Sequence, residues 1–75
     1  MVREQVTDIV AEMVANVMSI DVAVGDKVEA GDQVILLESM KMEIPVLAEA
    51  AGSVRQVRVA VGDVVQEGDV MVTVG

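Results

Sequence analysis

Apolar and polar residues alternate along much of this chain with a period of two, which is typical of strands with one buried face. The alternation runs through 17–24, where a slip near Met18 and Ser19 predicts a β-bulge, and it returns in 57–61. Valine supplies 19 of the 75 residues, and β-branched side chains favour strands. The pattern predicts an all-β fold.

A repeat with an offset of 37 residues organises the chain. The segment 24–32, Val-Gly-Asp-Lys-Val-Glu-Ala-Gly-Asp, recurs at 61–69 as Val-Gly-Asp-Val-Val-Gln-Glu-Gly-Asp. A gap-free comparison of 9–37 with 46–74 gives 11 identities in 29 pairs. Because two copies are too few for a solenoid, we predict one domain, 1–75, built from two halves about a pseudo-twofold axis.

Only the segment 6–14 has apolar residues at the spacing of a helix. Its repeat partner, 43–51, contains Pro45 near its start, and repeats should share their structure. We therefore predict β-structure for both segments. Pro45 cannot donate a hydrogen bond to a neighbouring strand, so it predicts an edge position or a bulge.

Glycine supplies the turns between the predicted strands. Glycine adopts positive φ without strain, and aspartate bonds nearby backbone amides, so four Gly-Asp pairs predict turns at 25–26, 31–32, 62–63 and 68–69. Gly52-Ser53 predicts a further turn.

Composition then excludes several classes of function. The chain contains neither histidine nor cysteine, so it has neither a Ser-His-Asp nor a Cys-His catalytic set, nor the usual zinc and haem ligands. No aspartate-rich loop has calcium-binding spacing, and we predict no metal site and no catalytic residue. A net charge of −8 without aromatic residues disfavours nucleic acids and anionic membrane surfaces.

The sequence also carries no targeting pattern. No apolar run approaches the roughly 20 residues that span a bilayer, and residues 1–5 do not begin a signal peptide. We expect a cytoplasmic protein whose isolated domain is monomeric.

Lys41 stands out in the run Glu38-Ser39-Met40-Lys41-Met42-Glu43, because it interrupts the apolar stretch 34–47. Burying its charge would be costly, so the lysine is predicted to project from a bend. The repeat makes 38–45 the hairpin that joins the two halves, and it matches this hairpin with the chain ends. Lys41 is therefore expected at the pole opposite both termini.

The run 38–42 resembles the biotin-attachment signature of biotin carboxyl carrier domains, and the flanking repeats resemble the two halves of that fold. The resemblance covers residues 9–74. It implies a flattened β-barrel of two four-stranded antiparallel sheets, with biotin attached covalently to Lys41. The related lipoyl domains usually carry Asp-Lys-Ala at this site, so Met40 and Met42 favour biotin. One departure is the segment 11–15, Ala-Glu-Met-Val-Ala, where the family usually has Ala-Pro-Met-x-Gly.

The resemblance further implies a non-catalytic carrier. A biotin protein ligase would modify Lys41, and the arm would move carboxybiotin between the biotin carboxylase and carboxyltransferase subunits of a biotin-dependent carboxylase. Met40 and Met42 would form a recognition surface, or would only pack on the end of the barrel. Glu38 and Glu43 would orient the ligase or remain solvated charges, and Ser39 belongs to the same motif but has no base to activate it.

Two other functions remain open at this point. One is a lipoyl carrier of a 2-oxoacid dehydrogenase system on the same scaffold. The other is an unmodified β-barrel interaction module.

Overall fold

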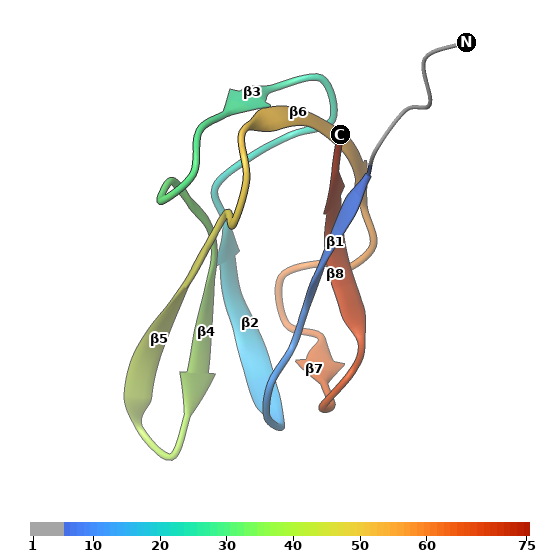
Figure 1. The fold of residues 1–75 in the computed structure, drawn as a ribbon. Helices are drawn as coiled ribbons and strands as arrows, with labels where there is room; N and C mark the ends of the chain where they lie inside the picture. Colours follow the sequence, from blue (N-terminus) through green and yellow to red (C-terminus); the bar gives the residue numbers. More distant parts are fainter. Residues whose placement is uncertain (1–5) are drawn as a thin grey trace, which may run out of the picture.

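A computed structural model describes residues 6–75 of the protein (Figure 1). Residues 1–5, for which the sequence predicts no signal peptide, lie outside the described part. The prediction of an all-β fold is confirmed by eight strands: β1 (Thr7–Val10), β2 (Ala15–Ile20), β3 (Lys27–Val28), β4 (Gln33–Ser39), β5 (Met42–Leu47), β6 (Gly52–Val57), β7 (Val64–Val65) and β8 (Val70–Val74). Among the described residues there is no helix of the length and apolarity needed to cross a membrane.

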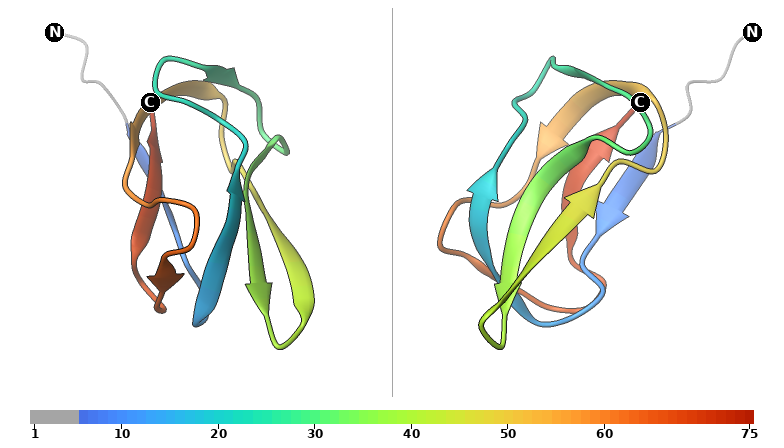
Figure 2. Two further views of the ribbon diagram at one scale, coloured as in Figure 1. Left: turned by 180° about the vertical axis from the view of Figure 1, so that it is seen from behind. Right: turned by 90° about the vertical axis from the view of Figure 1, so that its left-hand side faces the viewer.

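The strands form two four-stranded antiparallel sheets that lie against each other as two layers (Figure 2). One sheet has the order β1-β8-β6-β3 and the other has the order β5-β4-β2-β7. Each strand of the first sheet is the repeat equivalent of the strand at the same position in the second sheet, and the two strands come from different halves of the chain. This exchange confirms the predicted pseudo-twofold fold, and it means that neither half forms a sheet alone.

The same symmetry extends to individual backbone hydrogen bonds. The amide of Gly25 donates to the carbonyl of Val54 at 2.8 Å, and the amide of Gly62 donates to the carbonyl of Val17 at 2.9 Å. The 37-residue offset of the repeat relates each of these two bonds to the other. Val17 and Val54 are themselves buried equivalents, so the repeat preserves both hydrogen bonding and packing.

The four Gly-Asp turns have the predicted chemistry. All four glycines have positive φ, between 91° and 96°, where a Cβ atom would be strained. Each following aspartate accepts a hydrogen bond at 2.9 Å from the amide three residues before it, as Asp26 does from Ala23. These bonds close the turns locally.

The predicted turn at Gly52-Ser53 is wrong, because both residues lie in β6. A Cβ atom on Gly52 would lie 3.0 Å from Cγ1 of Val74 and 3.3 Å from the Gly75 carbonyl group. Glycine is therefore required at position 52, because Val74 and Gly75 of the same chain approach it closely.

Other local predictions are confirmed or shortened. The slip in the alternation is a register shift between Val17 and Ser19, the segment 6–14 contains β1, and Pro45 lies in the edge strand β5. The strand predicted over 17–24 ends earlier, at Ile20, and the strand predicted over 57–61 is wrong beyond Val57, which is the last residue of β6. The alternation continues beyond both ends because the loops keep apolar side chains packed against the core.

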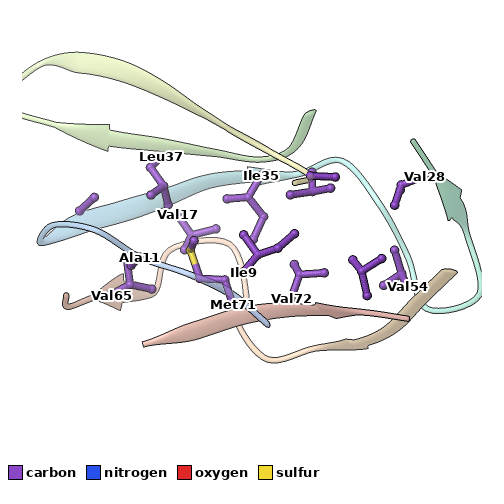
Figure 3. Close-up of a cluster of buried hydrophobic side chains, with 14 residues drawn as sticks. Ile9, Ala11, Val17, Val28, Ile35, Leu37, Val54, Val65, Met71 and Val72 are labelled. Atoms are coloured by element: carbon purple, nitrogen blue, oxygen red, sulfur yellow. The ribbon is translucent and has the colours of Figure 1, made fainter. Parts of the chain in front are cut away.

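The core lies between the two sheets and consists of aliphatic side chains and one methionine (Figure 3). Ile35, Val34, Met71 and Val72 are fully buried. Burial of a Val or Ile side chain contributes about 1.5–3 kcal/mol, so a chain of this size can be stable without aromatic residues or disulfides. This core fixes β4, the strand that leads to Lys41.

Candidate functional site

Lys41 occupies a two-residue turn between β4 and β5. The strands pair up to Ser39 opposite Met42, which leaves only Met40 and Lys41 in the loop. Both residues have positive φ, 53° for Met40 and 63° for Lys41. Two consecutive left-handed residues define a type I′ turn, whose twist matches that of a β-hairpin.

This turn is strained, because type I′ turns favour Asn-Gly rather than Met-Lys. A non-glycine residue in the left-handed region costs roughly 1–2 kcal/mol. The pairing of β4 with β5 must offset this cost. The sequence predicts the bend at Lys41 but not its type, since neither residue is one that the turn favours.

A hydrogen bond anchors the base of the hairpin. The hydroxyl of Ser39 donates to the backbone carbonyl of Val14 at 3.1 Å. Val14 belongs to the loop 11–14 between β1 and β2, which therefore lies beside the hairpin. Sequence reasoning placed Ser39 in the motif but missed this loop, whose only signal was the departure from Ala-Pro-Met-x-Gly.

The methionines beside Lys41 are open to solvent. Met40 is 92% exposed and Met42 is 66% exposed, and Lys41 is exposed as well. Met40 therefore does not pack on the end of the barrel in this structure. Exposed methionine offers an adaptable apolar contact to another protein.

The charges around the lysine leave its amine accessible. Glu38 and Glu43 are directly opposite in the β4–β5 pairing, where like charges repel weakly. Within residues 6–75 the amine of Lys41 makes no hydrogen bond and no ion pair. The lysine is thus presented without a partner among the described residues.

The hairpin occupies one end of the molecule. Figures 1 and 2 show the tip between β4 and β5 projecting beyond the neighbouring loops. The C-terminus and the start of β1 lie at the opposite end. For the C-terminus and the start of β1, this is the placement that the repeat predicts.

Comparison with known proteins agrees with this geometry. The model of the family described as "Biotin-requiring enzyme" matches residues 5–74, and the chain belongs to this family. Biotinylated protein TB7.3 of Mycobacterium tuberculosis is 60% identical over 40 residues, which are 53% of this chain and 56% of that protein. A biotin/lipoyl attachment protein of Bacillus subtilis is 47% identical over 36 residues, 48% of this chain and 49% of that protein. The matches thus span about half the length of these relatives.

Solved structures extend the similarity to the whole fold. The urea carboxylase of Kluyveromyces lactis matches 100% of this chain with a TM-score of 0.89 and 33% identity, over 7% of its own length. A single-chain, multi-domain long-chain acyl-CoA carboxylase matches 97% of this chain with a TM-score of 0.86 and 27% identity, also over 7% of its length. The lipoyl domain of the 2-oxoglutarate dehydrogenase complex of Azotobacter vinelandii has a TM-score of 0.72 and 24% identity, covering 83% of this chain and 78% of that domain. This last likeness concerns the fold alone.

Proposed function

We propose that the protein is a biotin carboxyl carrier and that biotin is attached covalently to Nζ of Lys41. The observation that carries the proposal is the placement of Lys41 on an exposed turn between Met40 and Met42 at the free end of the domain. Membership of the biotin-requiring family supports it, as does the similarity to relatives named as biotinylated.

The attachment reaction requires an external enzyme. A biotin protein ligase presents biotinyl-adenylate, and the neutral amine of Lys41 attacks its acyl carbon. An amide bond forms as the bond between the acyl carbon and the phosphate oxygen breaks and AMP leaves, and the two protons that the original ammonium group loses pass to a base of the ligase and to water. The carrier is the substrate in this step and supplies no catalytic group.

Attachment removes the positive charge of Lys41 and creates a long flexible arm. Carboxybiotin on this arm then moves between the biotin carboxylase and carboxyltransferase sites of a biotin-dependent carboxylase. Tethering holds the cofactor at an effective concentration in the mM range for short flexible links. The protruding hairpin suits this role, because it brings Lys41 forward without exposing the core.

Met40 and Met42 are proposed as the contacts that the ligase recognises, with Glu38 beside them. Ser39 supports them through its bond to the loop 11–14. A lipoyl carrier is the competing possibility on this scaffold, since the lipoyl domain shares the fold.

Intact mass after modification separates the two cofactors. The purified chain is incubated with a biotin protein ligase, biotin and ATP, and separately with a lipoate ligase, lipoate and ATP. We expect a gain of one biotinyl group in the first reaction and no gain in the second. Lipoylation without biotinylation would reject the proposal in favour of a lipoyl carrier, and no modification by either ligase would reject both.

A further inference from the structure

An open apolar groove lies between the edge strands of the two sheets, and Lys41 is not among the described residues that line it. Its volume is about 350 Å³, and it is lined from both β1 and β5. Val10 and Leu47 border it and are 41% and 47% exposed, and Met13 is 43% exposed. These apolar side chains contribute little to the core, so the core does not explain their presence.

Residues that the pseudo-twofold repeat relates to one another line both sides of the groove. Val10 is the repeat equivalent of Leu47, and Glu12 is the repeat equivalent of Glu49; all four residues line the groove. Its two walls therefore present the same pattern, an exposed apolar residue followed two positions later by an exposed carboxylate.

Both walls also have unpaired backbone. Within residues 6–75, β1 pairs only with β8 and β5 pairs only with β4. Each edge strand can thus accept an added strand through main-chain hydrogen bonds. Alternate side chains of the added strand would then contact the groove. Pro45 lacks an amide hydrogen, which limits pairing along β5 and makes β1 the better acceptor.

Charge selects among the possible occupants. Glu12 and Glu49 are exposed, and no lysine or arginine is among the described residues that line the groove. The net charge of −8 disfavours a second copy of the chain. A cationic segment gains from this field, whereas the biotinyl group itself carries no charge that would exploit it.

We propose that this groove binds an extended segment of a partner protein, with an apolar centre flanked by lysine or arginine. The segment adds to the edge of β1, places apolar side chains against Val10 and Leu47, and sets its basic residues beside Glu12 and Glu49. This surface goes beyond the carrier function, since it does not involve Lys41. It would hold the carrier to a partner while the hairpin remains free.

Backbone-amide NMR with two synthetic peptides tests the proposal. One peptide has alternating valine and threonine at its centre with lysine and arginine flanks, and the other has the same centre with glutamate flanks. We expect the basic peptide to shift the amides of β1 and β5 and to leave Met40, Lys41 and Met42 unchanged. The acidic peptide should leave all of them unchanged.

Matched variants identify the groups responsible. Replacing both groove carboxylates (Glu12→Gln with Glu49→Gln) should weaken binding of the basic peptide about fivefold. The control pair Glu29→Gln with Glu67→Gln removes the same charge from two exposed residues that do not themselves line the groove and should weaken binding much less. Leu47→Lys should abolish binding.

Several results would overturn the proposal. They are no shift with the basic peptide, equal binding of both peptides, equal effects of the two variant pairs, or shifts confined to the Lys41 hairpin. Concentration-dependent shifts of β1 and β5 without peptide would show self-association instead, and shifts there on biotinylation would show docking of the arm. Lys41→Arg should bind the peptide as the unchanged chain does, so failure of the carrier function does not mimic failure of the groove.

Discussion

The hydroxyl of Ser39 lies 3.1 Å from the backbone carbonyl oxygen of Val14 and donates a hydrogen bond to it. The two residues are 25 positions apart in the sequence. Their bond joins the last residue of β4 to the loop between β1 and β2, so it ties the lysine hairpin to the body of the domain. The hairpin that carries Lys41 is therefore anchored by a contact outside the hairpin itself.

Removing this hydroxyl should loosen the hairpin. We expect Ser39→Ala to lower the free energy of unfolding by about 0.5–1 kcal/mol, because the Val14 carbonyl regains only water as a partner. Urea denaturation measures the change. Ser53→Ala is the matched control, since within residues 6–75 only the backbone atoms of Ser53 form hydrogen bonds. Equal losses in the two variants would contradict the anchoring role of Ser39.

Because Met40 has a left-handed conformation, we expect one substitution there to raise stability and at the same time to impair biotinylation. Asparagine tolerates positive φ in a type I′ turn, so Met40→Asn should raise the free energy of unfolding by about 0.5–1 kcal/mol. The same variant should be a poorer substrate for biotin protein ligase, because it lacks the exposed apolar contact.

Met42→Asn is the control for this variant, since Met42 belongs to the extended strand β5 and is outside the set of residues with positive φ. We expect no gain in stability from it, because asparagine is disfavoured in strands. A gain in both variants, or in neither, would argue against strain at Met40. Denaturation and the initial rate of biotinylation are both measured.

Gly52 tests the close approach between β6 and the C-terminal residues. The added Cβ of Gly52→Ala would crowd Cγ1 of Val74, a buried side chain, and the backbone of Gly75. We expect a loss of roughly 1–2 kcal/mol from this overpacking, measured as a lower thermal midpoint. The lysine end should be unaffected, so biotinylation of the folded protein should proceed at its normal rate.

A matched substitution separates crowding from loss of a glycine. Ala51→Gly changes the neighbouring exposed residue in the opposite sense and crowds nothing. It should cost less than Gly52→Ala. If Gly52→Ala were as stable as the unchanged chain, the chain near Val74 would have to accommodate a methyl group without cost.

Much of the fold is predictable from the sequence because it is repetitive. Because Pro45 lies in the repeat partner of the segment 6–14, the repeat predicts strand rather than helix for that segment. The repeat also predicts that the hairpin lies opposite the chain ends. The Gly-Asp turns are predictable because their bonds form within four residues. In each case the information is local or is duplicated by the other half.

Other features could not be predicted, because they depend on contacts between distant residues. Gly52 has the sequence appearance of a turn, and only the approach of Val74 and Gly75 shows why glycine stands there. The bond from Ser39 to Val14 joins segments that the alternation does not relate. The type I′ turn is invisible for another reason, since Met40 and Lys41 are residues that such a turn disfavours.

We propose that Lys41 is the residue that receives biotin. The chain has only one other lysine, Lys27, which is exposed in β3 and serves as an internal control. Lys41→Arg and Lys27→Arg each keep the positive charge and remove one primary amine.

The unchanged chain and both variants are incubated with biotin protein ligase, biotin and ATP, and their capture by streptavidin is then measured. We expect the unchanged chain and Lys27→Arg to be captured equally and Lys41→Arg not to be captured. Capture of Lys41→Arg, or loss of capture in folded Lys27→Arg, would contradict the proposal.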